Sequence, residues 1–563
     1  MAMPSIIEQR RDQMIPRLDS LQIERVRRFG EVRSFAAGER IMTAGEVGPG
    51  LVVVLAGGIA VVEHTGLDGP QLVVTHERGD FLGELAQLAG RPALLDATAE
   101  GAVEALIIPP ERLRALMIAE AELGELIMRA LILRRIRILQ VGAGGPVILG
   151  RADDGDVLRL EDFLRRNGHP HHLLNPETDT PAKALIERFH VDPGQLPIVL
   201  CPGGQLLHNP GVNELARCLG MVRPIAADRV YDVAVVGAGP AGLATAVYAA
   251  SEGLSVLVLD SRAFGGQAGA SARIENYLGF PTGISGMALM ARAYNQAQKF
   301  GAEMAIPDEV TSLVADEDSA GHFSLNLLSG EVARARSVVI ATGARYRRPD
   351  VAALDAFESS SVHYWASPVE AKLCANQEVA LVGAGNSAGQ AVVYLAGQGI
   401  KVWMLVRREL DATMSRYLVD RVRSLDNVEV VTGAAVSGLE GQHGVLEAVR
   451  WRLGATGQEV RRPIRHVFLF IGAESNTAWL RGSAIALDAK GFVLTGEDAG
   501  AERHPLETNR RGIFAIGDVR AKSVKRIASA VGEGAQVVAA LHAFLAAHPA
   551  RPMVDAPVLA QSH

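Results

Sequence analysis

The stretch from Tyr231 to Asp260 constrains this chain most. A run of strand-forming apolar residues leads into a G-x-G-x-x-G turn at Gly237, Gly239 and Gly242, and an Ala-rich helix then leads to a second apolar strand. That strand ends at Asp260, 21 positions after Gly239. Glycines at this spacing allow a tight turn and close approach to a pyrophosphate, while the acid accepts a ribose hydroxyl. The stretch predicts a βαβ unit that binds an adenine dinucleotide.

Length and charge bound the other possibilities. A chain of 563 residues is too long for a single core and predicts three or four domains. The formal net charge of -7 gives no basic field for nucleic acid. The longest apolar stretch, Leu51 to Val62, is interrupted by two glycines and is too short to span a membrane. No signal region opens the sequence.

The three cysteines, Cys201, Cys218 and Cys374, show neither C-x-x-C spacing nor a disulfide framework. This usage favours a reducing cytoplasm.

Residues 1–140 begin with a short helical pattern and continue as short β-type runs with Gly turns, which predict a β-roll. The segment Phe81-Leu82-Gly83-Glu84-Leu85-Ala86 follows, and a helical pattern runs from Glu111 to Leu139. Here the chain resembles the cyclic-nucleotide-binding domain family. The resemblance implies that Glu84 binds a ribose hydroxyl and that an Arg some ten residues later pairs with the cyclic phosphate.

The phosphate-binding Arg is replaced in this sequence by Leu94-Leu95-Asp96. A carboxylate repels a phosphate, so binding would need Arg91 in a rearranged loop. Two interpretations stay open, a nucleotide sensor and a β-roll kept for docking or dimerisation. We favour the second.

Residues 141–225 follow a Gly-rich break and alternate strands and helices in the order of the thioredoxin fold, which this stretch resembles. Leu196-Pro197 stands where that family has a cis-proline. The redox turn is Arg151-Ala152-Asp153-Asp154-Gly155-Asp156, without cysteines. We therefore expect a docking or spacing module, with Cys201 and Cys218 as buried apolar residues. His169, His171 and His172 are interpreted as loop residues and not as a metal site.

From Tyr231 on, the motifs resemble the thioredoxin-reductase family of flavoproteins. They include Phe264-Gly265-Gly266-Gln267, Ile274-Glu275-Asn276 and Ala341-Thr342-Gly343. Two further apolar runs, Val467 to Gly472 and Phe514 to Asp518, are interpreted as the FAD domain resuming, and a helix opens at Lys525-Arg526-Ile527-Ala528. The fingerprint and the resemblance together place the following residues against FAD: Gly237, Gly239, Pro240, Ala241, Gly242, Asp260, Gly266, Gln267, Asn276, Thr342, Gly343, Gly517, Asp518, Arg526, Ile527 and Ala528.

A second fingerprint starts at Val379, with Gly383, Gly385 and Ala388 as G-x-G-x-x-A. Asn386 and Ser387 are expected to cap its helix over a pyrophosphate. The position equivalent to Asp260 is Val406, and Arg407-Arg408 follow. Two cations in place of an acid suit a 2′-phosphate and predict NADPH over NADH. The expected NADPH residues are Gly383, Gly385, Asn386, Ser387, Arg407, Arg408 and Arg416.

The predicted fold is α/β, with two Rossmann-like dinucleotide-binding domains preceded by a β-roll and a small thioredoxin-fold-like module. The predicted divisions are 1–140 for the β-roll with its helix, 141–225 for the module, 226–345 and 471–550 for the FAD domain, 346–470 for an inserted NADPH domain, and 551–563 for a tail.

The dithiol of thioredoxin reductases is missing. Its C-x-x-C should fall in Trp365-Ala366-Ser367-Pro368-Val369, and Cys374 stands alone nearby, most simply as a buried residue. The resemblance thus implies an FAD-dependent NADPH oxidoreductase, with a homodimer as the expected assembly. We expect its acceptor to be a quinone, an iron-sulfur or flavin protein, or oxygen. The alternative is a flavin-based redox or nucleotide sensor with regulatory N-terminal domains. No catalytic residue and no metal ligand is predicted.

Overall fold

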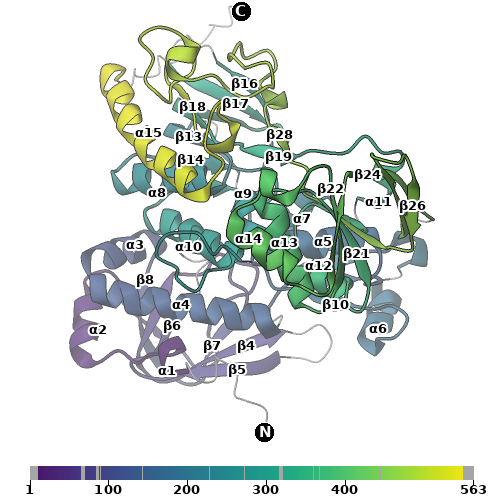
Figure 1. Cartoon of the computed structure of the whole chain (residues 1–563). Coiled ribbons are helices and arrows are strands. Elements are labelled where there is room, and N and C mark those ends of the chain that lie inside the picture. Colours follow the sequence, from purple (N-terminus) through teal and green to yellow (C-terminus); the bar gives the residue numbers. More distant parts are fainter. Residues whose placement is uncertain are drawn as a thin grey trace, which may run out of the picture.

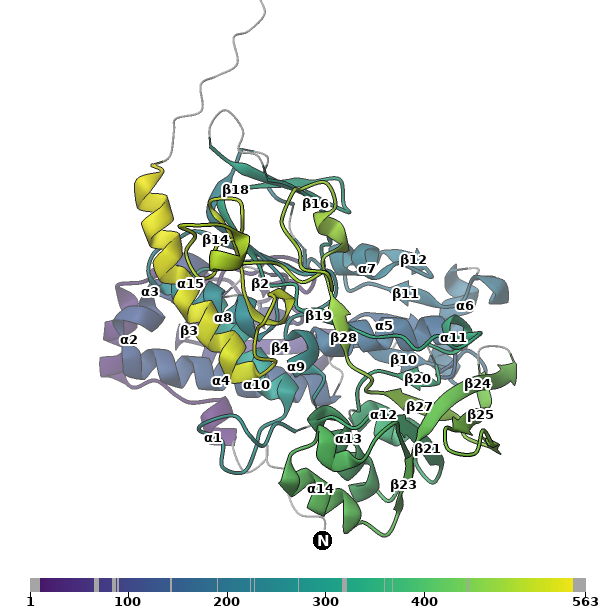
Figure 2. The ribbon, with the colours of Figure 1, turned by 45° about the horizontal axis from the view of Figure 1, so that its top comes forward.

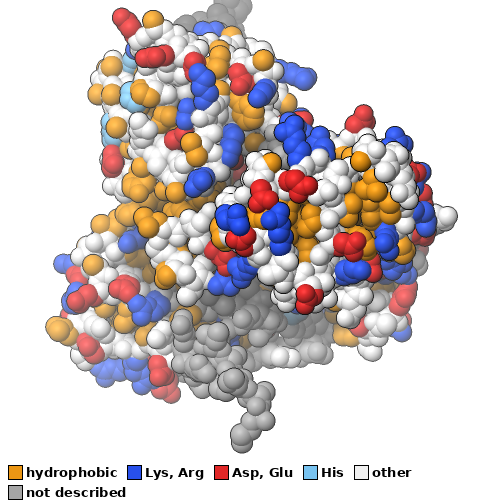
Figure 3. All heavy atoms as spheres, viewed as in Figure 1, with side chains coloured by type: hydrophobic (Ala, Val, Ile, Leu, Met, Phe, Trp, Pro, Cys, Tyr) orange, Lys and Arg blue, Asp and Glu red, His pale blue; other side chains and the backbone are white. Residues whose placement is uncertain are grey.

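The computed structural model describes residues 11–549, except 65–69, 84–87, 89–90, 142–143, 190, 223, 227, 272, 316–320, 359, 367 and 443–444. Its sheets form four groups that follow one another along the chain, with one interruption (Figure 1). Charged side chains of both signs are interspersed on the face shown in Figure 3.

The N-terminal group is a β-roll of two four-stranded sheets, ordered β1-β8-β3-β6 and β2-β7-β4-β5. All its strand pairs are antiparallel, and helices pack on one side of the roll over Leu51, Val53 and Phe81. The elements are α1 (Arg11–Met14), α2 (Ser20–Arg27), β1 (Glu31–Phe35), β2 (Arg40–Met42), β3 (Leu51–Ala56), β4 (Ile59–His64), β5 (Pro70–His76), β6 (Phe81–Leu82), β7 (Asp96–Ala99), β8 (Val103–Ile108), α3 (Pro110–Ala119) and α4 (Ala121–Val141).

The helical pattern from Glu111 to Leu139 forms two helices, so the single long helix expected there is wrong. The break is at Glu120, which leaves helical geometry with φ -119° and ψ 78°. A Cβ at Gly124 would lie 2.7 Å from the carbonyl oxygen of Met117, so only glycine lets the start of α4 lie so close to α3. Periodicity alone carries no sign of this close approach.

The second group has the strand order β10-β9-β11-β12, with β11 antiparallel to both neighbours. This mixed sheet, with its three helices, matches the predicted thioredoxin-like arrangement, and the Leu196–Pro197 peptide bond is cis. The elements are β9 (Val147–Leu149), α5 (Gly155–Arg166), β10 (His172–Leu174), α6 (Thr180–Phe189), η3 (Pro193–Gln195), β11 (Ile198–Leu200), β12 (Leu206–His208) and α7 (Val212–Cys218).

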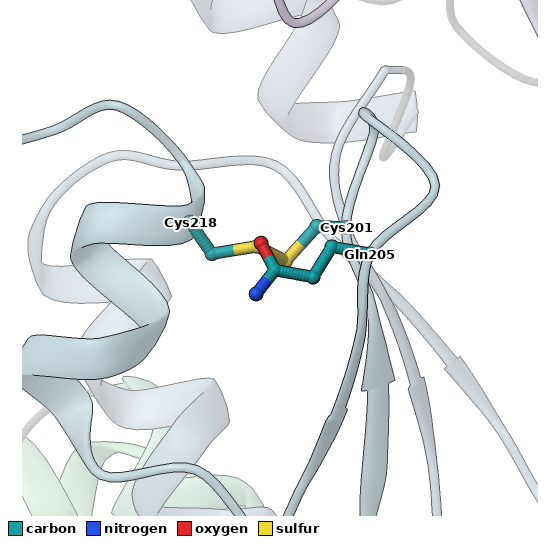
Figure 4. The surroundings of a disulfide bond; sticks show 3 residues. All are labelled: Cys201, Gln205 and Cys218. Atoms are coloured by element: carbon teal, nitrogen blue, oxygen red, sulfur yellow. A yellow bond between two sulfur atoms is a disulfide. The ribbon is translucent and has the colours of Figure 1, made fainter.

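Cys201 and Cys218 form a disulfide in this module, which corrects their interpretation as separate apolar residues (Figure 4). Cys201 follows β11 and Cys218 ends α7, and their Cα atoms lie 6.5 Å apart. The fold packs α7 on the sheet, and this tertiary contact brings together residues 17 positions apart. Cysteine usage therefore no longer supports a reducing cytoplasm.

The histidines of this module also differ from the expectation. His172 belongs to β10 and not to a loop. Carboxylates do lie near, since Glu161 is 3.2 Å from His171 and Glu63 is 3.6 Å from His172. His169 is buried, with Nδ1 3.0 Å from the carbonyl oxygen of Pro170.

The third group is a seven-stranded sheet, ordered β15-β14-β13-β18-β17-β16, with β29 pairing β18. Strand β29 comes from the far end of the chain, so the intervening segment is an insertion. The elements are β13 (Val230–Val236), α8 (Pro240–Ser251), β14 (Val256–Leu259), α9 (Gly266–Gly269), α10 (Gly286–Lys299), β15 (Glu303–Ala305), β16 (Val310–Val314), β17 (Phe323–Leu327), β18 (Val332–Ile340), η5 (Ala478–Leu480), η6 (Gly496–Ala499), β29 (Ile513–Ala515), η7 (Gly517–Val519) and α15 (Ile527–Ala547).

The inserted group has a parallel sheet, ordered β20-β27-β21-β22-β23, and an antiparallel sheet, ordered β24-β25-β26. It is joined to the third group through the β19–β28 pair. The run from Val467 is strand β27 of the parallel sheet, which falls within the predicted 346–470 division, whereas its description as the start of the resuming FAD domain is wrong. The elements are β19 (Ala344–Tyr346), α11 (Leu354–Phe357), β20 (Val362–His363), α12 (Pro368–Leu373), β21 (Glu378–Val382), α13 (Asn386–Gly397), β22 (Lys401–Val406), η4 (Leu410–Ala412), α14 (Arg416–Arg423), β23 (Val428–Thr432), β24 (Ala434–Gln442), β25 (Val445–Leu453), β26 (Glu459–Arg462), β27 (His466–Leu469) and β28 (Ala473–Ser475).

Helix α15 is the one helix, within the described part of the chain, whose length and hydropathy would suit a membrane span. The apolar stretch Leu51 to Val62 instead forms β3 and β4. Helix α15 packs along α8 (Figure 2), where a Cβ at Gly534 would lie 2.6 Å from the carbonyl oxygen of Ala241. Its apolar side chains belong to the core of the third group.

Candidate functional site

The first fingerprint forms the turn between β13 and α8. Gly237 has φ +113°, and a Cβ there would lie 2.3 Å from the carbonyl oxygen of Ala341. A Cβ at Gly242 would lie 1.9 Å from the carbonyl oxygen of Gly237. Gly239 is the N-cap of α8 and has no atom within 4 Å of a built Cβ, so the helix N-terminus is open to an anion. Pro240 and Ala241 begin the helix. This cradle fits a pyrophosphate.

Asp260 lies directly after β14, beside the turn. Its Oδ2 accepts a hydrogen bond of 2.9 Å from the Ala238 amide, and its Oδ1 accepts one of 3.0 Å from the Arg262 amide. Burial raises the pKa of Asp260, against the lowering effect of these amides. The two amides fix the carboxylate at the edge of the turn, where the sequence places a ribose.

Residues far apart in sequence meet the same helix. A Cβ at Gly517 would lie 3.0 Å from the Cβ of Ala241, and the Gly517 amide donates to Glu533 at 2.6 Å. Burial raises the pKa of Asp518, which follows. Arg526 is the N-cap of α15, and Ile527 and Ala528 are its first residues. The structure thus brings the fingerprint, the Gly-Asp turn and the start of α15 together.

The other predicted FAD residues are spread more widely. Gly266 is the first residue of α9, and the side-chain amide of Gln267 donates a hydrogen bond to the backbone carbonyl of Ala344. Thr342 donates to the carbonyl of Asn476 at 2.8 Å, and Gly343 has φ +62°. Asn276 is exposed. The neighbouring Glu275 lies 3.4 Å from Arg421 on α14, so this segment contacts a helix of the inserted group.

The second fingerprint repeats the geometry between β21 and α13. Gly383 has φ +138°, and a Cβ there would lie 2.3 Å from the carbonyl oxygen of Phe470. The N-cap is Gly385, and no side chain caps the helix, so the capping role expected of Asn386 and Ser387 is wrong. Asn386 instead accepts a hydrogen bond of 2.7 Å from the Ser415 backbone amide. The contact forms because the chain returns through η4 and α14 packs against α13. Ser387 is exposed.

Arg407 and Arg408 lie just beyond the carboxyl end of β22, where Val406 is still buried. Both are exposed, and neither has a hydrogen-bond or ion-pair partner among the residues that the structure describes. Arg416 opens α14 and is paired with Asp420, with Nε 3.0 Å from Oδ1. The two consecutive cations are therefore free to meet a phosphate, whereas Arg416 would first have to leave its partner.

Comparison with known proteins bears on both fingerprints. The family described as pyridine nucleotide-disulphide oxidoreductase matches residues 231–534. The chain belongs to this family. It is an NAD(P)H-dependent flavin oxidoreductase of thioredoxin-reductase type, with FAD and NADPH as cofactors. The cyclic nucleotide-binding domain family matches residues 32–120.

Relatives cover the flavoprotein part. Thioredoxin reductase of Mycoplasmopsis pulmonis is 30% identical over 308 residues, 54% of this chain and 95% of its own. The F component of alkyl hydroperoxide reductase from Escherichia coli is 32% identical over 315 residues, 56% of this chain and 58% of its own. The structure of Lactococcus lactis thioredoxin reductase aligns with a TM-score of 0.51 at 27% identity, covering 56% of this chain and 99% of that one.

The segment in which we expected a dithiol, Trp365 to Val369, contains no cysteine. The Trp365 indole donates to Glu370 at 2.9 Å, and the guanidinium of Arg166, on α5 of the thioredoxin-like module, lies 4.1 Å from the Trp365 ring centre. Cys374 is fully buried, and burial raises its pKa to about 12. The thiol therefore stays protonated, in agreement with its interpretation as a buried residue. Sequence reasoning missed the Arg166–Trp365 contact, since no local pattern signals an interface between modules.

The β-roll also contacts the flavoprotein part. Arg91 donates to the Tyr294 hydroxyl at 2.5 Å, and Tyr294 stacks on Phe264 with ring centres 4.4 Å apart. Arg91, the one substitute considered for a cyclic phosphate, is thus used between domains. Asp96 accepts from the Ala44 amide at 2.6 Å. Glu84 lies outside the described residues.

Proposed function

We propose that this oxidoreductase oxidises NADPH and delivers the electrons to an acceptor other than a dithiol of its own nucleotide domain. The observation that supports the proposal is that the segment in which we expected a dithiol has Trp365 and no cysteine, with the Arg166 guanidinium 4.1 Å from the Trp365 ring centre. Cys374 offers no substitute, because it is buried and protonated. A quinone, an iron-sulfur or flavin protein, or oxygen are the acceptors that such a site suits.

Two separate sets of residues bind the two nucleotides, FAD at the first fingerprint and NADPH at the second. FAD, when bound, takes a hydride from NADPH and supplies electrons to the acceptor. Gly237, Gly239 and Gly242 hold its pyrophosphate, and Asp260 orients its ribose. Gly383 and Gly385 hold the pyrophosphate of NADPH, and Arg407 and Arg408 bind its 2′-phosphate. The homodimer, the cytoplasmic location and the domain boundaries given above stay predictions.

A second candidate function is a flavin-based sensor. The contact from Arg91 through Tyr294 to Phe264 favours it, because Phe264 precedes the Gly265-Gly266 turn that opens α9. A change in the β-roll would reach the expected FAD site through three touching side chains.

Anaerobic stopped-flow mixing with NADPH tests the main proposal. We expect flavin bleaching within seconds and sustained NADPH oxidation when menadione is added. The triple variant Cys201→Ser, Cys218→Ser, Cys374→Ser should keep the menadione rate within about twofold of the parent. Loss of turnover both in that variant and in Cys374→Ser alone would show a cysteine-dependent outlet in the nucleotide domain and overturn the proposal. Slow or absent bleaching in the parent would favour the sensor.

A further inference from the structure

The Cys201–Cys218 disulfide fixes the last helix of the thioredoxin-like module (Figure 4). Cys218 is the last residue of α7, and Cys201 lies in the turn between β11 and β12. A helix of seven residues is marginal by itself, so its position depends on what holds it to the sheet. Leu215 and Ala216 hold its inner face by burial, and the disulfide holds its last residue. Cys201 is buried and Cys218 is half-buried, so the bond is open to a thiol at Cys218.

Arg217, the neighbour of Cys218, connects this helix to the FAD sheet. Its Nε donates to Oδ1 of Asn213 on the same helix at 3.0 Å. Its Nη2 lies 3.5 Å from Oδ2 of Asp308, and its Nη1 lies 3.5 Å from Oε1 of Glu331. Asp308 follows β15, and Glu331 lies between β17 and β18. One arginine therefore ties the end of α7 to two carboxylates of the FAD domain.

Asp308 is the carboxylate that depends on this cation. It is 1% exposed, and its Oδ2 accepts a hydrogen bond of 3.0 Å from the Ser329 hydroxyl. Its Oδ1 is buried and has no hydrogen-bond partner among the residues that the structure describes. Burial raises the pKa of Asp308, while Ser329 and Arg217 act in the opposite direction. Because an unpaired buried carboxylate is costly, loss of Arg217 would destabilise this segment.

The backbone of the same segment supports the first dinucleotide cradle. The Asp308 amide donates to the Asp260 carbonyl at 2.8 Å, and the Asp260 amide donates to the Ala305 carbonyl at 3.4 Å. The carboxylate of Asp260 in turn accepts from the Ala238 amide in the fingerprint turn. Two residues, Arg217 and Asp308, thus separate the disulfide from the acid that is expected to bind the FAD ribose.

We propose that the Cys201–Cys218 pair is a redox switch on flavin retention. With the disulfide formed, Arg217 stays on Asp308 and Asp260 is held in place. When a dithiol reduces the pair, the end of α7 is released, the contact of Arg217 with Asp308 weakens, and FAD leaves faster. The inference depends on the assignment of the first cradle to FAD and not on which acceptor takes the electrons.

The chemical step is thiol–disulfide exchange. A thiolate of the dithiol attacks Cys218 Sγ, the bond between the two cysteines breaks, and Cys201 leaves as a thiolate that takes up a proton. The second thiol of the dithiol then displaces Cys218, which also takes up a proton. The protein gains two electrons and two protons, and the dithiol is oxidised to its disulfide.

Flavin release tests the proposal. The flavin-loaded chain is diluted, and the fluorescence of released FAD is followed with and without dithiothreitol. We expect release to be at least about fivefold faster from the reduced chain than from the oxidised chain. The Cys201→Ser, Cys218→Ser variant should release FAD at the fast rate in both conditions, which separates the switch from any action of dithiothreitol on the flavin. Equal release rates from the oxidised and reduced parent, or no disulfide by mass spectrometry in the oxidised parent, would overturn the proposal.

Excess FAD keeps the cradle filled. The menadione turnover expected above for the cysteine variants is therefore measured with FAD added, and it stays independent of the release rate. Failure of the switch and failure of the proposed electron route give different results in these two assays.

Arginine variants test the route from the disulfide to the flavin. Arg217→Gln should release FAD fast in both conditions, with less than about a twofold effect of dithiothreitol. Asp308→Asn, which keeps the shape of the side chain without its charge, should likewise lose the response. Arg159→Gln is the matched control, because its side chain is 35% exposed against 34% for Arg217 and it pairs with Asp156 inside the module. It should keep the full response. A full dithiothreitol response in both Arg217→Gln and Asp308→Asn would reject this route.

Discussion

The two dinucleotide units use the same backbone for different purposes. The Cβ that is absent at Gly237 and at Gly383 would in each case lie 2.3 Å from a carbonyl oxygen of a neighbouring strand end. The N-caps Gly239 and Gly385 have nearly the same dihedrals, with φ -75° and -83°. What differs lies around this shared frame. A common turn can therefore hold either nucleotide, and the surroundings decide which one is kept.

Coverage is the first difference. Helix α8 is buried along almost its whole length between the sheet and α15, whereas α13 is covered by the shorter α14 and buries fewer of its residues. Charge is the second, with Asp260 after one strand and Arg407 and Arg408 after the other. A covered cradle suits a cofactor that stays, and an exposed one suits a nucleotide that must enter and leave at each turnover.

The largest expected effect comes from adding one methyl group to the first cradle. Gly242→Ala places a Cβ 1.9 Å from the Gly237 carbonyl oxygen, which cannot move without opening the turn. We expect flavin content, measured by absorbance per chain, to fall at least about tenfold. The matched change Ala388→Gly, at the equivalent position of the second unit, should cost about 1 kcal/mol of helix stability and keep full flavin content. Equal flavin loss in both variants would contradict the comparison.

The charge difference is tested at the second cradle. Replacing both Arg407 and Arg408 with Ala should raise the KM for NADPH by about 10- to 100-fold, because charge-assisted contacts to the 2′-phosphate are lost. The KM for NADH should change less than about twofold. Arg416→Ala should have a smaller effect on NADPH, since Arg416 is paired with Asp420. Parallel rises for both nucleotides would remove the assignment of these arginines to the phosphate.

A smaller effect is expected from two histidines in the inserted sheet. His363 Nε2 lies 3.1 Å from His466 Nδ1, and burial lowers the pKa of His363 to about 3 and that of His466 to about 4. Below pH 6.5 the unfolded chain takes up protons that the folded chain refuses, so stability falls as the pH falls. One such histidine accounts for about 2 kcal/mol of unfolding free energy between pH 7 and pH 5.

His363→Phe should therefore make the urea-unfolding free energy less dependent on pH over that range, while an aromatic ring is kept in contact with Phe468, whose ring centre lies 4.8 Å from that of His363. The quantity compared is the slope of the unfolding free energy against pH, because the variant also leaves His466 without its hydrogen-bond partner. Flavin release should follow pH equally in the variant and the parent, since the FAD sheet is unchanged. An unaltered slope would mean that the pair does not titrate as described.

The sequence predicted what local spacing determines. Both fingerprints, the β-roll and the thioredoxin-like strand order follow from glycine positions and apolar runs, and all are present. It failed where distant segments meet. The Cys201–Cys218 disulfide, the contact of Arg91 with Tyr294 and the bond from Ser415 to Asn386 each depend on packing between elements. Val467 was misplaced for the same reason, because an apolar strand does not specify which sheet it joins.

The pairing of β29 with β18 has a consequence for how the protein is made. Synthesis runs from the N-terminus, so the whole nucleotide sheet, ending at Leu469, can be complete while the FAD sheet still lacks Ile513 to Ala515. Helix α15, which covers α8, emerges later still. The flavin cradle can close only when the last part of the chain leaves the ribosome. A nascent chain stalled at residue 500 should therefore bind NADPH but fail to retain flavin.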